Sequence, residues 1–182
     1  METEILDKTI EKTDKKSQKK RIWAYKKLGY SKAETKEVVE ALNALLANYH
    51  VHYQKLRNYH WNVKGADYFD IHEQFEQQYD QAKLNIDEIA ERIRVFGYRP
   101  ISTLKEYLEV SDIKETPTDK KMTGMEMVNE ILNDFEILLS YMVDAADAAI
   151  DVGDIGTEEM IKDFVKDMEK THWMFTSFAS EE

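Results

Sequence analysis

Five residues of this 182-residue chain have the types and spacing that binding of a transition metal requires. They are His60, His72, Glu76, Asp87 and Glu91. Imidazole and carboxylate groups together suit ferrous iron, manganese and zinc. Because the chain contains no cysteine, thiolate ligands, disulfides and cysteine nucleophiles are excluded. The sequence therefore predicts a metal site that uses nitrogen and oxygen ligands.

Four of these residues are expected on one face of a single helix. At about 100° per residue from His72, Glu76 lies at about 40°. Asp87 and Glu91 lie at about 60° and about 100° on the same wheel. The apolar positions between residues 75 and 86 fall at about −20° to −80°, so the metal-binding types flank the stripe that faces the core. That flank is free to meet another subunit.

The distance along this helix indicates how the face could hold metal. Glu76 and Asp87 are eleven residues apart, which is about 16 Å along a helix and too far for one ion. Antiparallel packing of two copies about a two-fold axis would bring the 72/76 end of one helix opposite the 87/91 end of the other. A di-iron site within one chain needs two Glu-x-x-His elements, and only Glu169 with His172 has that form. The spacing therefore favours a site shared within a dimer.

Each of these residues also has a structural explanation. His60 continues the apolar face of its helix, where a lone histidine is more often a core residue than a ligand. His72 with Glu76, or Asp87 with Glu91, would more often be a solvated helix face when each pair is taken alone. The second pair is slightly costly in that interpretation, because two carboxylates four residues apart repel each other. His50, His52 and His172 are interpreted as structural.

Two long helices are predicted to carry the five residues. The first begins at Ser31, whose spacing to Glu34 is typical of a capping box, and continues until Gly65 interrupts its apolar face. The second runs from Tyr68 to Phe96, and Gly97 followed by Pro100 is a typical stop.

Two more long helices are predicted after a crossover. The stretch from 99 to 121 contains both prolines and a brief apolar group, Ile101, Leu104, Tyr107 and Leu108, which favours one short helix. The third long helix opens at Thr123, with Glu126 in capping-box spacing, and the fourth covers about 157–178. An all-α, ferritin-like four-helix bundle with a long crossover carrying a short helix is expected.

Bulk composition agrees with one helical domain. Glycine and proline number only 6 and 2, while charged residues make up 34% of the chain, a balance that favours long helices. No apolar run approaches the roughly 20 residues that cross a bilayer, and the first twenty residues have no apolar signal-peptide centre. We therefore expect a soluble, cytoplasmic protein that does not associate with membranes.

Charge is distributed unevenly along the chain. Between Lys8 and Lys27, nine lysines and arginines face two acidic residues, a local net charge of +7. Residues 1–30 carry a net charge of +4. Because the whole chain carries −11, residues 31–182 must carry −15. We expect a flexible basic tail over residues 1–30 ahead of an acidic bundle domain over residues 31–182. Such a tail could bind DNA by counterion release, although lysine-rich termini are often only solvated.

Three segments resemble the Dps family, the DNA-binding proteins from starved cells, which are miniferritins of the ferritin-like superfamily. They are the run YHWNVKG from Tyr59 to Gly65, the run FDIHEQFE from Phe69 to Glu76, and IDEIAER around Asp87 and Glu91. The similarity is strongest from Leu42 to Pro100 and extends over most of residues 31–178.

The resemblance implies a ferroxidase, an oxidoreductase that oxidises ferrous iron and stores the ferric product inside a hollow dodecamer. Hydrogen peroxide would be the preferred oxidant, so that the protein protects against oxidative stress. By the family pattern, His60, His72 and Glu76 of one subunit would face Asp87 and Glu91 of its two-fold mate, with Trp61 beside the site. Many relatives carry aspartate at the position of Glu76, a departure that bears on the second iron position.

The resemblance also implies acidic pores for iron uptake and, in some relatives, DNA binding. Asp154, Glu158 and Glu159 are the candidate pore acids, although an acidic first helical turn is equally expected from the helix dipole. The candidate DNA contacts are Lys15, Lys16, Lys19, Lys20 and Arg21. The main hypothesis is a ferroxidase and iron store. The alternatives are a nucleoid-associated DNA-binding protein and an acidic helical assembly without chemistry.

Overall fold

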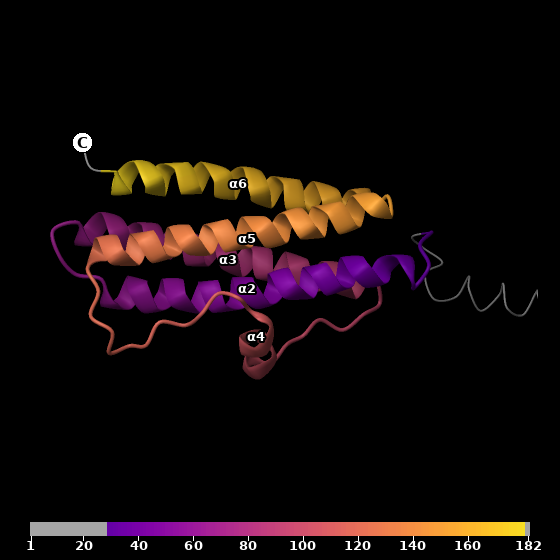
Figure 1. Ribbon diagram of the computed structural model, residues 1–182, viewed down its shortest axis with the longest axis horizontal. Coiled ribbons are helices and arrows are strands. Elements are labelled where there is room, and N and C mark those ends of the chain that lie inside the picture. Colours follow the sequence, from indigo (N-terminus) through magenta and orange to yellow (C-terminus); the bar gives the residue numbers. More distant parts are fainter. Residues whose placement is uncertain (1–28, 181–182) are drawn as a thin grey trace, which may run out of the picture.

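Residues 29–180, the part of the chain that the computed structural model describes, form five helices and no strand (Figure 1). The four long helices are α2 (Glu34–Asn62), α3 (Tyr68–Val95), α5 (Gly124–Asp151) and α6 (Ile155–Ala179). α2 packs against both α3 and α5, and α5 packs against α6. Residues 96–123 form the crossover and contain the short helix α4 (Leu104–Val110), which lies on α2. The predicted all-α four-helix bundle with one long crossover is confirmed.

Both predicted capping boxes are present at helix N-termini. At α5, the Glu126 amide donates to Thr123 Oγ1 (3.2 Å) and the Thr123 amide donates to Glu126 Oε2 (2.7 Å). The same exchange joins Ser31 and Glu34, at 3.3 and 2.6 Å. Regular helix begins only at Glu34, because residues 32 and 33 form a turn inside the box. The predicted basic tail lies almost wholly outside the described residues and stays a prediction.

The stop predicted at Gly97 is also present. Gly97 has φ +81°, the left-handed conformation that favours glycine. Its amide donates to the carbonyl of Arg94 (2.9 Å), and the amide of Tyr98 donates to that of Ile93 (3.3 Å). This pair of bonds is a Schellman motif, which satisfies the last carbonyls of α3. Gly153, with φ +69°, ends α5 in the same way.

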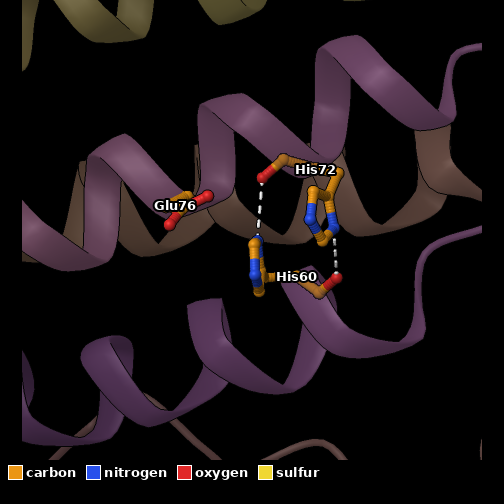
Figure 2. Close-up of side chains that lie close together, drawn as sticks. All are labelled: His60, His72 and Glu76. Atoms are coloured by element: carbon orange, nitrogen blue, oxygen red, sulfur yellow. Dashed lines mark hydrogen bonds between the residues drawn. The ribbon is translucent and has the colours of Figure 1, made fainter.

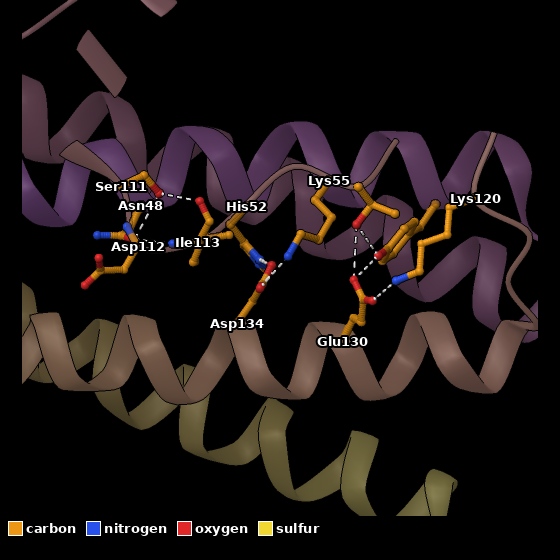
Figure 3. Close-up of polar contacts among 11 residues, drawn as sticks. Asn48, His52, Lys55, Ser111, Asp112, Ile113, Lys120, Glu130 and Asp134 are labelled. Atoms are coloured by element: carbon orange, nitrogen blue, oxygen red, sulfur yellow. Dashed lines mark hydrogen bonds and ion pairs between the residues drawn. The ribbon is translucent and has the colours of Figure 1, made fainter. Parts of the chain in front are cut away.

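One buried amide on α2, that of Asn48, binds three groups of the crossover (Figure 3). Asn48 Oδ1 accepts hydrogen bonds from Ser111 Oγ (3.1 Å) and from the amides of Asp112 (3.0 Å) and Ile113 (3.1 Å). Ile113 itself is buried in the core. These bonds satisfy backbone groups that burial would otherwise leave unpaired.

No helix among residues 29–180 is both long and apolar enough to cross a membrane.

The core lies between the four long helices and draws apolar residues from each. The largest fully buried side chains are Tyr49, Tyr59, Phe75, Phe96, Phe135, Leu42, Leu45, Leu46, Leu56, Ile89, Ile93 and Ile113.

The three histidines interpreted as structural each have a partner outside the candidate site. His50 stacks on Tyr107 of α4 with 3.8 Å between ring centroids, and burial lowers the pKa of His50 to about 4, so it is neutral at pH 7. His52 is buried against Asp134. His172 Nε2 lies 3.8 Å from a carboxylate oxygen of α5.

Candidate metal centre

The α2–α3 hairpin brings three of the five candidate ligands together. His60 lies in the last turn of α2, and His72 and Glu76 lie near the start of α3 (Figure 2). Each offers a ligand atom within 4.8 Å of the other two. Gly65, with φ +124°, lies in the short turn that places the end of α2 opposite the start of α3. Within residues 29–180, no other group of three or more histidines and carboxylates lies this close together.

The two imidazoles hold each other's orientation through backbone bonds. His60 Nδ1 donates to the carbonyl of His72 (2.9 Å), and His72 Nδ1 donates to the carbonyl of His60 (2.8 Å). Their rings stack with 3.7 Å between centroids. Because a carbonyl only accepts, each Nδ1 carries the proton and each Nε2 keeps a free lone pair. This is the arrangement by which metal-binding histidines are fixed in the correct tautomer.

The donor set fits a divalent transition metal. Two oriented imidazole nitrogens and one carboxylate suit ferrous iron, manganese or zinc. His60 is buried, His72 is half-buried and Glu76 is exposed, so the cluster opens to the surface of the chain. Three ligands on one side leave positions for further carboxylates or for an oxidant.

Asp87 and Glu91 do not join this cluster within one chain. Both are exposed, and both lie further along the same continuous helix, α3. The separation of about 16 Å between the Cα atoms of Glu76 and Asp87, expected for eleven helical residues, therefore applies here. Their assignment to a second half of the site stays a prediction.

Trp61 was expected beside the site. It directly follows His60, is exposed, and lies beneath the Arg57 guanidinium, 4.7 Å from the ring centroid. Its role next to bound metal stays a prediction.

Two tyrosines that sequence reasoning missed also contact the cluster. Tyr68 stacks on His72 at 4.9 Å between ring centroids. Tyr79 donates a hydrogen bond from its hydroxyl to Glu76 Oε1 (3.4 Å). Partial burial, followed by the charges of Glu76 and Asp80, raises the pKa of Tyr79, so its hydroxyl remains a donor at neutral pH. The spacing of Tyr79 to Glu76, three residues on one helix, was the available signal.

The candidate pore acids lie at the start of α6. Asp154 is buried, caps α6 by accepting from the Thr157 amide (3.3 Å), and forms an ion pair with Arg92. Glu158 forms an ion pair with Lys162 one turn later, and Glu159 is exposed. Asp154 thus has a structural role within the chain, and the pore assignment stays a prediction.

Gly156 gives space to the arginine that pairs with Asp154. A Cβ at this position would lie 2.9 Å from the Arg92 terminal nitrogen Nη2 and 3.1 Å from Cζ. We expect Gly156→Ala to lower the free energy of unfolding by about 1–3 kcal/mol, the cost of leaving a buried polar group unpaired. That cost exceeds the helix-propensity gain of up to about 1 kcal/mol. Urea denaturation of both proteins measures the sign of this change in the free energy of unfolding. A more stable variant would show that Arg92 moves aside at no cost.

The sequence of this chain is similar to those of known ferritin-like proteins. Residues 39–181 match the ferritin-like domain family, so the bundle is a ferritin-like domain. The "DNA protection during starvation protein 2" of Bacillus anthracis is 38% identical over 146 residues, which cover 80% of this chain and 99% of the relative. General stress protein 20U of Bacillus subtilis is 36% identical over 144 residues, 79% of this chain and 98% of that protein.

Solved structures agree with this assignment. The crystal structure of a Dps protein from Vibrio cholerae, described as a ferritin-like diiron-carboxylate protein, matches with a TM-score of 0.82 and 34% identity over 86% of this chain and 98% of that one. Dps from Staphylococcus aureus matches with a TM-score of 0.76 and 39% identity over 80% and 96%. The chain belongs to the Dps family, as the sequence resemblance implied.

Proposed function

We propose that this protein is a ferroxidase that binds ferrous iron at sites shared between two copies of the chain, oxidises it and stores the ferric product. The observation that carries the proposal is the reciprocal bonding of His60 and His72, which leaves both Nε2 lone pairs free in a cluster whose ligand atoms, with that of Glu76, lie within 4.8 Å of one another. Membership of a family with diiron-carboxylate relatives supports iron as the substrate. The hollow oligomer, which we take to be a dodecamer, would hold the mineral and protect the cell from oxidative stress.

The proposed chemistry divides between two subunits. His60, His72 and Glu76 would bind iron on one side, while Asp87 and Glu91 of a second copy would complete the site and balance its charge. Two ferrous ions would each give one electron to hydrogen peroxide, whose O–O bond breaks as it takes up two protons to form two waters. Consuming both reactants in one site would suppress release of hydroxyl radical.

The test is an anaerobic titration with ferrous iron, followed by a pulse of hydrogen peroxide while ferric absorbance is recorded. We expect Asp87→Ala to lower the initial rate by at least about 10–100-fold, the range found for outer-shell changes at metal sites. Glu88→Ala is the matched control, because Glu88 is the adjacent exposed carboxylate on α3. Equal rates for wild type and Asp87→Ala would reject the shared ferroxidase.

DNA binding is a second candidate function, favoured by the basic cluster and by the names of the relatives. Its proposed contacts, Lys15, Lys16, Lys19, Lys20 and Arg21, lie outside the described residues. The −15 charge of residues 31–182 opposes DNA, so the tail would supply nearly all of the affinity. A salt-sensitive gel shift that disappears on deletion of residues 1–27 would support this function.

A further inference from the structure

Tyr79 contacts two of the three clustered ligands at the same time. It lies one turn after Glu76 on α3, and its hydroxyl donates to Glu76 Oε1 (3.4 Å). The rings of Tyr79 and His60 pack edge to face, with 5.3 Å between centroids and 84° between planes. This tyrosine therefore links the exposed carboxylate of α3 to the buried imidazole of α2.

Glu76 needs such a contact more than the two histidines do. The imidazoles are fixed by backbone carbonyls, whereas Glu76 is exposed and its long side chain has several rotatable bonds. Within residues 29–180, the bond from Tyr79 is the hydrogen bond that this carboxylate receives from a side chain.

Tyr79 is itself well placed to act as an anchor. It is half-buried, and its ring also packs edge-on against Tyr53 of α2, with 6.2 Å between centroids and 87° between planes. Two rings from α2 thus limit the motion of one ring on α3. These ring contacts hold the Tyr79 hydroxyl where the side chain three residues earlier on the helix, Glu76, can reach it.

We propose that Tyr79 is a positioning residue that holds Glu76 for metal binding, an inference that rests on the proposed iron site. The hydroxyl engages one carboxylate oxygen and leaves the other to the metal ion, so Glu76 binds through a single oxygen. Glutamate, which is one methylene longer than aspartate, can therefore serve at this position, because the hydrogen bond from Tyr79 limits the conformational freedom that the extra methylene adds. Tyr79 acts through Glu76 and is not itself a ligand.

The experiment titrates the purified full-length protein with cobalt(II) under anaerobic conditions and follows the visible absorption bands, whose intensity reports coordination geometry. Tyr79→Phe keeps the ring contacts and removes only the hydroxyl. We expect the dissociation constant to rise by about 10-fold, with changed band intensities, as for loss of an outer-shell partner. Tyr53→Phe is the matched control, since it removes a hydroxyl from the neighbouring ring, and it should bind as wild type does.

A double-mutant cycle separates positioning from packing. If Tyr79 acts through Glu76, Tyr79→Phe should have no further effect in a Glu76→Ala background. An equal loss in both backgrounds would overturn the inference, as would wild-type binding by Tyr79→Phe, and either result leaves the iron site standing. If wild type binds no cobalt(II), or binds it equally well after His60→Ala, the proposed function fails as well.

Discussion

Replacement of Asp134 by alanine is expected to lower the free energy of unfolding by about 3–5 kcal/mol, the usual cost of removing one partner from a buried ion pair. Asp134, on α5, accepts hydrogen bonds from Lys55 Nζ (2.7 Å) and His52 Nδ1 (3.1 Å), both on α2 (Figure 3). All three side chains are buried. The substitution would leave the Lys55 ammonium in the core without its counter-ion.

Urea denaturation at pH 7 and constant protein concentration measures this effect, since oligomer stability depends on concentration. Asp147→Ala, an exposed change on the same helix, should alter the free energy by no more than about 0.5 kcal/mol. The pair Lys55→Met with Asp134→Leu should recover much of the loss, because apolar residues often replace buried ion pairs without cost. A loss below about 1 kcal/mol in Asp134→Ala would mean that Lys55 reaches water in the variant.

The helix ends could be predicted because their signals are local. Thr123 and Glu126 satisfy each other's amides across one turn, and Gly97 supplies the positive φ that a Schellman motif needs. The box Thr103–Glu106 at α4 has the same spacing and was overlooked. Such signals need no knowledge of tertiary contacts.

Long-range polar partners could not be predicted in this way. Asn48 and Asp134 look like ordinary polar residues in the sequence, and only the packing of α2 against the crossover and α5 gives them buried donors. Likewise, the angles on a helical wheel predicted that His72 and Glu76 share one face of a helix. His60 joins them only because the hairpin places the end of α2 opposite the start of α3. Helical periodicity carries no information about such neighbours.

The proposed shared site makes a second strong prediction, that two inactive variants should regain activity when they are combined. His72→Ala would remove a ligand from one half of the proposed site, and Asp87→Ala would remove a ligand from the other half. In a mixed two-fold dimer, one site carries both changes and its twin carries neither. Random pairing of equal amounts should restore about one quarter of the sites, and hence about one quarter of the wild-type peroxide-dependent rate.

The measurement is the rate of iron oxidation after the two variants are co-expressed or refolded together. His60→Ala combined with His72→Ala is the control, because both changes fall in the same half and no pairing yields an intact site. Recovery in the first mixture alone requires ligands from two chains. If neither mixture recovers activity although exchange of subunits is confirmed, Asp87 does not contribute to the site of the partner. Other carboxylates, not yet assigned, would then have to complete the centre.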